Sequence, residues 1–532
     1  MSELDRDGLG TDTGKGEGIM SRIVLRGRYV VTEPEDLPSG GMIENGAVLI
    51  EDGRVAFAGP AGELGRVEGA DVLGSERHLV IPGLVNAHTH GRGLMGLQTN
   101  IPDGYFEPWL LDYWVQHPLD VYLDTLYANT RMIRSGVTQV MHSGYSRDWS
   151  RTEEEVRDTL RAYADSGLRV AYAVGMENRN TLVYEDNDAF LARLPGNLAA
   201  RVRAQFDSLG PANAERTFGF IAELCAEYAG QEGIRIFFGP TGAEWCSDEL
   251  LERVAREAER LDAGIHLHCL ESLFQREYAE RAYNRSSIEI IRDLGIAGPH
   301  TSIAHGTWAA QSDFAILCET DTTVCHNASS NLRLRMGIAP VAQMQEAGVR
   351  VAIGMDGQTL NNDEDMLQEM RLVRNLHRLP QGPGFDPEMT SFDILRMATV
   401  NGAEATNYGK ATGRLAKGCL GDAVILDYDA ITLPYISPEV HPVDALVQMG
   451  KAAHIDAVVI GGRPVFADGE FVRLDEAEIA RNLGEIAAQP PPEGFREMRR
   501  VMGELKPHVV AFYAEWEMKT LNEQGYLVNA LR

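Results

Sequence analysis

The chain has 532 residues, too many for one small domain and enough for a large α/β domain with a smaller companion. Hydrophobic residues make up 44% and charged residues 24% of the chain, which is an ordinary globular composition. The net charge of −29 argues against nucleic acid or an anionic membrane surface as a partner, because an acidic surface repels phosphate.

The location of the protein is predicted from three sequence features. The six cysteines form no CxxC pair, which favours free thiols in a reducing compartment. No apolar run approaches the roughly 18–20 residues of a membrane span. The first residues are rich in Gly, Asp and Glu and lack the apolar core of a secretory signal, so residues 1–22 are predicted to be a flexible leader. We therefore expect a cytoplasmic protein.

Short alternating strands follow the leader, separated by Gly and Asp turns. The pattern predicts strands at Ile23–Thr32, Ala47–Glu51, Val55–Ala58 and Leu79–Ile81. Similar runs return near the other end, at Asp422–Tyr428, Ala445–Met449, Ile455–Ile460 and Pro464–Phe466. Neither set is large enough for a stable sandwich, so residues 23–82 and 415–475 are predicted to form one composite β-sandwich domain.

Residues 83–414 alternate between apolar runs and amphipathic segments, a pattern typical of parallel βαβ units. Eight strands are expected, at Leu84–Asn86, Val137–His142, Leu168–Val174, Ile234–Gly239, Ile265–Cys269, Ser302–His305, Thr323–His326 and Val349–Asp356. Eight such units fit a closed (β/α)₈ TIM barrel. The rival fold, a doubly wound open sheet, would carry a Gly-rich phosphate fingerprint after its first strand, and this sequence has none.

Two segments interrupt the alternation. Met176–Pro211 is far longer than an ordinary βα loop, and two interpretations stay open: a lid over the barrel mouth, or a peripheral insertion. Residues 476–532 have helical patterns interrupted by three prolines, which predicts a helical C-terminal tail that packs on the barrel or on a neighbouring subunit.

A candidate metal site follows from the strand ends, where barrels of this type collect their active sites. His88 and His90 end the first strand at a spacing that directs both imidazoles to one face. His268 ends the fifth strand and Asp356 follows the eighth. Three imidazoles and one carboxylate suit a divalent ion such as zinc or Fe(II). An open position on that ion would hold a water that is converted to hydroxide near neutral pH.

Two further residues are candidates for proton transfer. Glu271 lies three residues after His268, at the barrel rim, where it can take a proton from the water and pass it to a substrate nitrogen. His305 ends the sixth strand and is placed to hydrogen-bond the nucleophile or the developing tetrahedral group. Asp356 can accept a proton from the nucleophile in addition to binding the metal.

Other histidines near strand ends have simpler interpretations. His266 lies one step deeper than His268 on the same face and is interpreted as a core or supporting residue. His326 is interpreted as a substrate or structural contact. For His142, pocket lining and an ordinary satisfied hydrogen bond are equally good interpretations.

Several separate motifs resemble the amidohydrolase superfamily, and more narrowly its cytosine deaminase, chlorohydrolase and triazine-hydrolase branch. These are Val80-Ile-Pro-Gly-Leu-Val-Asn-Ala-His-Thr-His, His268-Cys-Leu-Glu271, Ala304-His305-Gly-Thr-Trp, Ser329-Ser-Asn331-Leu-Arg-Leu-Arg-Met-Gly-Ile-Ala-Pro-Val341 and Gly354-Met-Asp356-Gly. The resemblance runs from about Ile23 to Gly469. It implies a metal-dependent barrel that uses the ligands and catalytic residues named above, and a homo-oligomer.

The strand-four region departs from these relatives in two ways. Many of them bridge two metals with a lysine there, but the segment Ile234–Glu244 has no lysine, so one ion per subunit is expected, zinc before iron. Many deaminases also carry a histidine after this strand, where this chain reads Thr241-Gly-Ala-Glu244-Trp245. Glu244 and Trp245 are therefore expected near the substrate, with Trp109 and Asn331 as further contacts.

The predicted function is hydrolysis of a C–N bond by a metal-bound hydroxide, with deamination of an aminated N-heterocycle as the leading reaction. The alternatives left open are hydrolysis of an amide, urea or carbamate, and dechlorination of a triazine-like ring. A non-catalytic scaffold is disfavoured because all six key positions are present. The small zinc deaminases are excluded because the sequence has no Pro-Cys-x-x-Cys.

Overall fold

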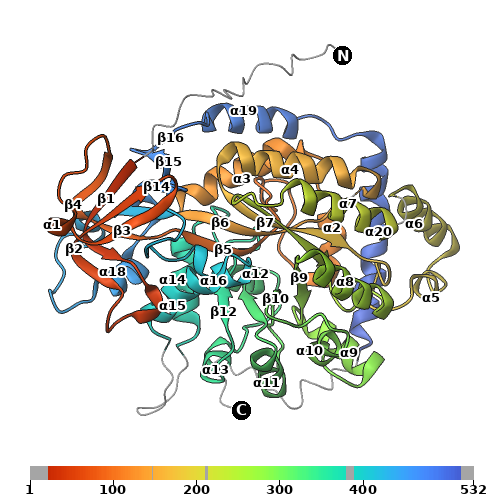
Figure 1. Cartoon of the computed structure of the whole chain (residues 1–532). Helices are drawn as coiled ribbons and strands as arrows, with labels where there is room; N and C mark the ends of the chain where they lie inside the picture. Colours follow the sequence, from red (N-terminus) through yellow and green to blue (C-terminus); the bar gives the residue numbers. More distant parts are fainter. Residues whose placement is uncertain (1–21, 147, 210–213, 379–388, 517–532) are drawn as a thin grey trace.

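The computed structural model describes residues 22–146, 148–209, 214–378 and 389–516. Nearly all of the expected leader, residues 1–21, and the last sixteen residues of the expected tail therefore lie outside the described residues. Two eight-stranded sheets organise the described chain, one at the left and one in the middle of the molecule in Figure 1.

The larger structural unit is a parallel sheet whose strands follow one another in chain order. Its strands are β5 (Leu84–Thr89), β6 (Val137–Ser143), β7 (Arg169–Met176), β8 (Ile234–Pro240), β9 (Gly264–Cys269), β10 (Thr301–His305), β11 (Thr323–His326) and β12 (Val351–Ile353). The last strand returns to the first, where the amide of Asp356 donates to the carbonyl of His88 at 2.8 Å. The predicted (β/α)₈ barrel is confirmed, and every predicted barrel strand overlaps an observed one.

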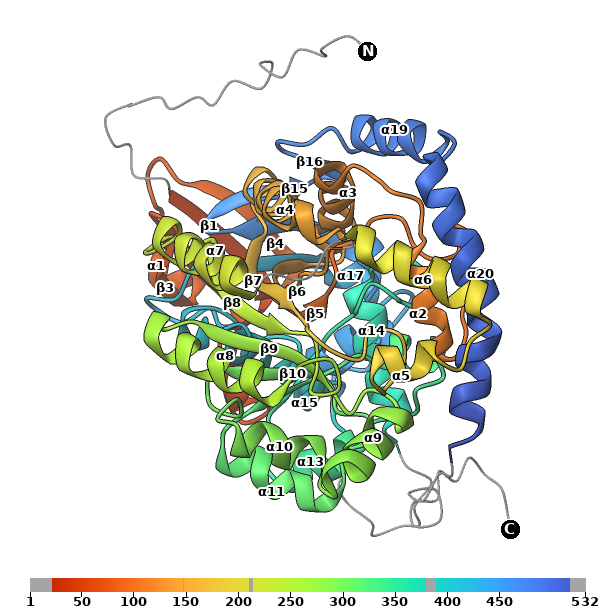
Figure 2. The same ribbon diagram turned by 90° about the vertical axis from the view of Figure 1, so that its right-hand side faces the viewer.

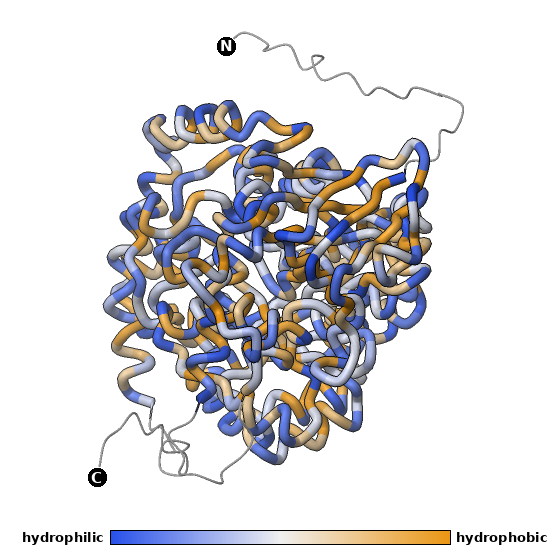
Figure 3. The backbone as a smooth tube through the Cα atoms, turned by 90° about the vertical axis from the view of Figure 1, so that its left-hand side faces the viewer, coloured by the Kyte–Doolittle hydropathy of each residue, from blue (hydrophilic) through white to orange (hydrophobic). Residues whose placement is uncertain are grey.

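Helices cover the outside of this barrel (Figure 1). They are α3 (Val121–Arg134), α4 (Thr152–Ser166), α7 (Ala214–Glu227), α8 (Asp248–Leu261), α9 (Leu273–Tyr283), α10 (Ser287–Asp293), α11 (Gln311–Glu319), α12 (Ala328–Arg333), α13 (Val341–Glu346), α14 (Met366–Leu376), α15 (Ser391–Met397) and α16 (Val400–Ala405). In α8 the side chain of Ser247 caps the N-terminus, and Leu250, Leu251 and Val254 face the barrel. Figure 3 shows the resulting alternation of hydrophilic and hydrophobic residues along the peripheral helices. Within the described residues, no helix combines the length and the apolar character that crossing a membrane requires.

The second sheet is built from both ends of the chain, as predicted. Its strands are β1 (Arg22–Val31), β2 (Met42–Glu51), β3 (Arg54–Pro60), β4 (Asp71–Pro82), β13 (Ala423–Asp427), β14 (Ile455–Ile460), β15 (Arg463–Ala467) and β16 (Glu470–Phe471), in the order β16-β15-β14-β13-β4-β1-β2-β3. Ile50 of β2 and Val459 of β14 share one apolar cluster, although three strands separate them in the sheet. The sheet therefore curls over its own core.

One predicted strand of this domain is wrong. Ala445–Met449 belongs to the helix α18 (Pro442–Met449), which packs on α15. His441 caps the helix through its side chain and Pro442 occupies the first turn, where its missing N–H costs nothing. Val443, Leu446 and Val447 recur at helical spacing and are buried, so the apolar run reflects one face of a helix.

A cap lies over the barrel mouth and has its own apolar cluster. It combines α2 (Phe106–Trp114), the Met176–Pro211 insertion with α5 (Asn187–Leu191) and α6 (Gly196–Leu209), and the tail helix α20 (Glu493–Ala514), which follows α19 (Glu476–Ala487). Figure 2 shows α20 running beside α2 and α6. The described part of the insertion and the tail thus pack on each other, and Thr181 of the insertion reaches the central cavity.

Candidate metal centre and active site

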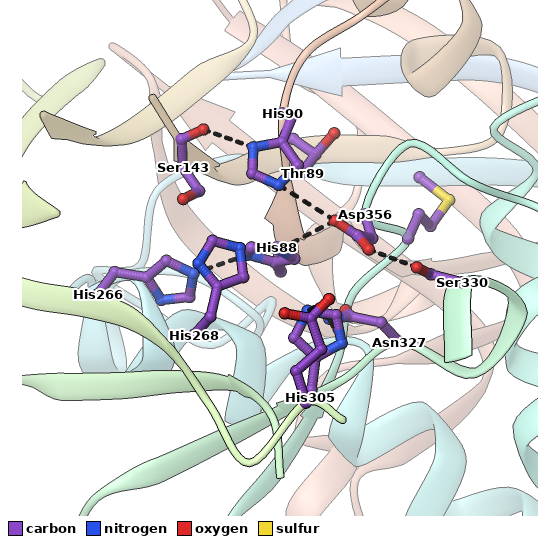
Figure 4. Close-up of polar contacts among 12 residues, drawn as sticks. His88, Thr89, His90, Ser143, His266, His268, His305, Asn327, Ser330 and Asp356 are labelled. Atoms are coloured by element: carbon purple, nitrogen blue, oxygen red, sulfur yellow. Dashed lines mark hydrogen bonds and ion pairs between the residues drawn. The ribbon is translucent and has the colours of Figure 1, made fainter. Parts of the chain in front are cut away.

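Four predicted metal ligands converge at the barrel mouth (Figure 4). One ligand atom each from His88, His90 and His268 lies within 4.8 Å of the others, and the same holds for His88, His305 and Asp356. Oδ1 of Asp356 lies 3.1 Å from Nε2 of His88 and 3.4 Å from Nε2 of His90. The buried Nε2 of His88 has no hydrogen-bond partner among the described residues, so this donor set fits a divalent ion bound through three nitrogens and one oxygen.

The opposite ring nitrogen of each histidine is held by the fold. Nδ1 of His90 lies 2.8 Å from the carbonyl oxygen of Ser143, and Nδ1 of His268 lies 2.9 Å from that of Thr241. A carbonyl can only accept, so Nδ1 carries the proton and Nε2 is left free for a metal. Nδ1 of His88 instead lies 2.8 Å from Nε2 of His266.

The charge states of these groups suit metal binding. Burial lowers the pKa of His90 to about 4 and holds the pKa of His268 well below its usual value, so both imidazoles are neutral. Burial alone would raise the pKa of Asp356, but its close contact with His88 and the other nearby imidazoles lower it below its usual range. A neutral imidazole set facing an ionised carboxylate is the arrangement that a metal requires.

The backbone is unusual where these side chains turn inward. Asp356 and His305 have φ values of +60° and +75°, in the left-handed region that few residues other than glycine adopt. Beside them, a Cβ atom on Gly354 would lie 2.3 Å from Oδ1 of Asn327 and 2.8 Å from Cβ of His88. Only glycine lets the end of β12 approach β5 closely enough to bring Asp356 to His88.

Glu271 and His305 face each other beside the ligands. Oε1 of Glu271 lies 3.4 Å from Nε2 of His305. The amide of Glu271 donates to Oε1 of Gln275 at 2.6 Å, which fixes the turn into α9. Burial, then the charges of Asp356, Glu244 and Glu107, hold the pKa of Glu271 well above its usual value. A carboxyl in this state can carry a proton near neutral pH, as a proton shuttle must.

These groups open into a cavity with about 920 Å³ of empty space, part of which is open to solvent. Its floor contains His90, His268, Glu271 and Asp356. Aromatic residues make up much of the wall: Phe106, Trp109, Tyr113, Trp114, Tyr145 and Trp245. A cavity with a polar floor and flat aromatic walls suits a planar, largely apolar ring that carries a few polar atoms.

The predicted substrate contacts divide into two groups. Trp109 and Trp245 line the cavity, and the ring of Trp109 stacks on Tyr113 at 5.1 Å between centroids. Glu244 is 1% exposed and is not among the lining residues. His142 lines an adjoining cavity of about 400 Å³ that shares His90 and Arg92 with the first, and its Nδ1 lies 3.0 Å from the hydroxyl of Tyr163.

Two further predicted contacts are also absent from the cavity wall. His326 is fully buried, and its Nε2 lies 3.0 Å from Nε2 of His377. Oδ1 of Asn331 lies 3.0 Å from Nδ1 of His305. Asn331 therefore orients His305, and Nε2 of that ring lies 3.4 Å from Oε1 of Glu271 and 3.5 Å from Nδ2 of Asn327.

Sequence reasoning did not single out two charged residues of the wall, Arg92 and Glu177. Arg92 comes two residues after His90 and lies 3.7 Å from the carboxylate of Asp124. Glu177 directly follows β7. The signal available for both was their position at the carboxyl end of a predicted barrel strand, where polar residues collect around the active site.

Comparison with known proteins identifies the family and the fold. Residues 79–465 match the model of the Amidohydrolase family. The 5'-deoxyadenosine deaminase of Methanothermobacter thermautotrophicus is 32% identical over 470 residues, which cover 86% of this chain and 97% of that protein. Two zinc-containing crystal structures share the fold. One is an adenosine deaminase from Xanthomonas campestris, 22% identical with a TM-score of 0.73, covering 90% of this chain and 99% of its own.

The other is an atrazine chlorohydrolase from Arthrobacter aurescens, 20% identical with a TM-score of 0.69. The alignment covers 87% of this chain and 100% of that one. At these identities the two structures establish the shared fold. The family match spans well over half of the chain and includes every strand that contributes to the site. The chain belongs to the amidohydrolase family.

Proposed function

We propose that this protein is a mononuclear, metal-dependent aminohydrolase that removes the amino group of an aminated N-heterocycle. The observation that carries the proposal is the convergence of four ligand side chains, Glu271 and His305 at the barrel mouth, beneath one aromatic-walled cavity whose floor contains His90, His268, Glu271 and Asp356. The deaminase names of similar proteins favour an adenine nucleoside as the first substrate to test.

Each residue has a role that its surroundings support. A bound divalent ion, zinc before iron, would supply a hydroxide nucleophile near neutral pH. Glu271 takes one proton from the attacking water and delivers it to a ring nitrogen, and Asp356 accepts the second proton, which passes to the amine as it departs as ammonia. Burial lowers the pKa of His305 to about 4, so its neutral Nε2 can accept a hydrogen bond from the same water. Asp356 holds negative charge beside the nucleophile and its Oδ2 accepts from Ser330 at 2.5 Å.

We also propose the division of the chain into a composite β-domain of residues 23–82 and 415–475, a catalytic barrel of residues 83–414 and a helical tail from residue 476. The separate apolar clusters of the curled sheet and of the cap support these boundaries. All six cysteines are free thiols, which supports a cytoplasmic location. A homo-oligomer stays a prediction, and light scattering on the purified protein would test it.

The decisive experiment is mass spectrometry of the products formed by zinc-loaded protein. The substrate panel should contain adenine nucleosides, aminated pyrimidines, pterins and triazines together with aryl ureas, amides and carbamates, with a chelator-treated control. Exchange of an amino group for oxygen would establish the deaminase. Loss of chloride from a triazine, or cleavage of a urea or amide, would contradict the proposed deaminase activity and show that the same centre catalyses the alternative reaction.

A further inference from the structure

Three residues with carboxyl groups line the cavity in the described part of the chain: Asp356, Glu271 and Glu177. The first two belong to the metal centre and its proton transfer. Glu177 has no role in that chemistry. A buried carboxyl is costly to retain without a partner, so its presence on the wall of a substrate cavity calls for a ligand.

The backbone on both sides of Glu177 is fixed to the loop after β8. The amide of Thr241 donates to the carbonyl of Met176 at 2.9 Å, and the amide of Asn178 donates to the carbonyl of Trp245 at 3.0 Å. Glu177 therefore projects from a rigid edge between two barrel strands. A recognition group needs this kind of support, because looseness of about 1 Å weakens a directional contact.

The side chain of Glu177 is only 9% exposed, and within the described residues no cation pairs with it. Its hydrogen-bond partner is the hydroxyl of Thr241, which also donates to the carbonyl of Met176 at 3.2 Å, and the carboxyl has a second oxygen that can bind a ligand. Burial, only partly opposed by that hydrogen bond, raises the pKa of Glu177 to about 7. Near neutral pH this carboxyl can act either as a donor or as an acceptor.

The loop beside Glu177 is the one that departs from related deaminases. Glu244 of that loop was the expected substrate contact, but its side chain is buried away from the cavity and its Oε1 has no partner among the described residues. Trp245 forms part of the wall instead. The carboxyl that does reach the cavity on this side comes from the neighbouring strand.

We infer that Glu177 is a specificity-determining residue that hydrogen-bonds a second nitrogen of the substrate ring, distinct from the nitrogen served by Glu271. The inference rests on the proposed function and names the adenine ring as the group recognised. Adenine offers N3 and N7 as unprotonated acceptors, and the two can be deleted one at a time by replacing nitrogen with C–H. Removing the acceptor leaves a buried donor without a hydrogen-bond partner, which weakens binding strongly.

The test measures binding separately from turnover. Zinc-loaded Glu271→Gln protein is titrated by calorimetry with 5'-deoxyadenosine and with its 3-deaza and 7-deaza analogues. The same titrations are repeated with the double variant that also carries Glu177→Met. Met matches Glu closely in size and removes only the polar group. Glu177→Gln, which keeps a donor, is the conservative variant, and Glu244→Gln is a matched control because its carboxyl is also buried but does not line the cavity.

The expected result is that Glu177→Met weakens binding of 5'-deoxyadenosine about tenfold to a hundredfold. One deaza analogue should bind the protein that retains Glu177 more weakly than 5'-deoxyadenosine does, by a similar factor. Its affinity should not fall further when Glu177 is replaced by Met. Glu177→Gln should restore most of the affinity, and Glu244→Gln should leave it unchanged. Equal weakening of all three ligands, or none, would overturn the inference.

Turnover of 5'-deoxyadenosine by the unsubstituted protein is scored independently. Turnover combined with equal weakening of all ligands would reject the role of Glu177 and leave the deaminase standing. If Glu177→Met weakens only the ligands that retain one particular ring nitrogen, but the protein does not turn over 5'-deoxyadenosine, Glu177 recognises that nitrogen and the protein does not deaminate this compound.

Discussion

Nδ1 of His88 lies 2.8 Å from Nε2 of His266, whose own Nδ1 lies 2.7 Å from the hydroxyl of Ser302. His88 is thus the one proposed histidine ligand that another imidazole orients, while His90 and His268 rely on backbone carbonyls. For His88 to offer Nε2 to a metal, its Nδ1 must donate and His266 must accept. Burial holds the pKa of His266 well below its usual value, which keeps it neutral and able to accept.

Replacing His266 by Leu should therefore weaken zinc binding about tenfold to a hundredfold, because the orientation and basicity of His88 would be lost. Competition with a chromophoric chelator measures this directly. His266→Gln keeps an acceptor at the end of the side chain and should recover part of the affinity. A Leu variant with the zinc affinity of the unsubstituted protein would show that the contact has no effect on the metal.

Glu271→Gln should reduce kcat by about 10²- to 10⁴-fold, the usual contribution of a positioned acid–base group, while one zinc per chain is retained. The amide keeps the shape of the side chain but cannot carry the proton. Elemental analysis and steady-state kinetics on the same preparation test both halves. Near-normal turnover would remove Glu271 from the proton transfer.

Removing the metal should lower the melting temperature as well as abolish turnover. A ligand present at 100 times its Kd stabilises the folded state by about 2.7 kcal/mol. Thermal scans with chelator and then with added zinc should show the loss and its recovery. His90→Ala should fold but respond weakly to zinc, so an equal response from both proteins would contradict the proposed ligand set.

Glu244 should make the protein less stable as the pH rises. Burial, with some contribution from the charge of Glu107, raises its pKa from 4.5 in the reference state to about 8. Below pH 4.5 the carboxyl is protonated in both the folded and the unfolded state. As the pH rises from 4.5 toward about 8, the unfolded chain loses the proton and the folded chain keeps it, so the free energy of unfolding falls across this window.

Glu244→Gln should remove this dependence. The stability gained by this substitution should be on the order of 3–4 kcal/mol larger at pH 8 than at pH 5. Urea unfolding of both proteins at the two pH values measures the difference. A constant difference between the two proteins at both pH values would mean that Glu244 does not retain its proton in the folded state.

The tail helix α20 should contribute to the stability of the cap. Leu505 is fully buried in the cluster shared by α20, α2 and the insertion. Leu505→Ala should cost about 2–5 kcal/mol, because it leaves a cavity in that cluster. Val510→Ala is the control on the same helix, since Val510 is 49% exposed and its loss should cost under about 0.5 kcal/mol. Similar losses in both variants would argue against a packed cap.

Most of the barrel could be predicted from the sequence, because each strand is a short apolar run bounded by turn residues and followed by an amphipathic helix. The run Ala445–Met449 misled the prediction because five apolar-rich residues fit either periodicity, and the cap supplied by His441 and Pro442 decided for a helix. The metal-ligand candidates were equally visible, since His88, His90 and His268 stand at strand ends, where parallel barrels direct side chains to one mouth.

What the tertiary structure alone decided is which polar residues face the cavity. Glu177 and Glu244 are both acidic residues that follow barrel strands, and their sequence contexts do not distinguish them. Only the packing of the insertion, the tail helix and the β8 loop places Glu177 on the wall and buries Glu244 behind it. Strand-end position is a local property that sequence determines by itself, whereas the direction of a side chain in a loop depends on contacts between segments hundreds of residues apart.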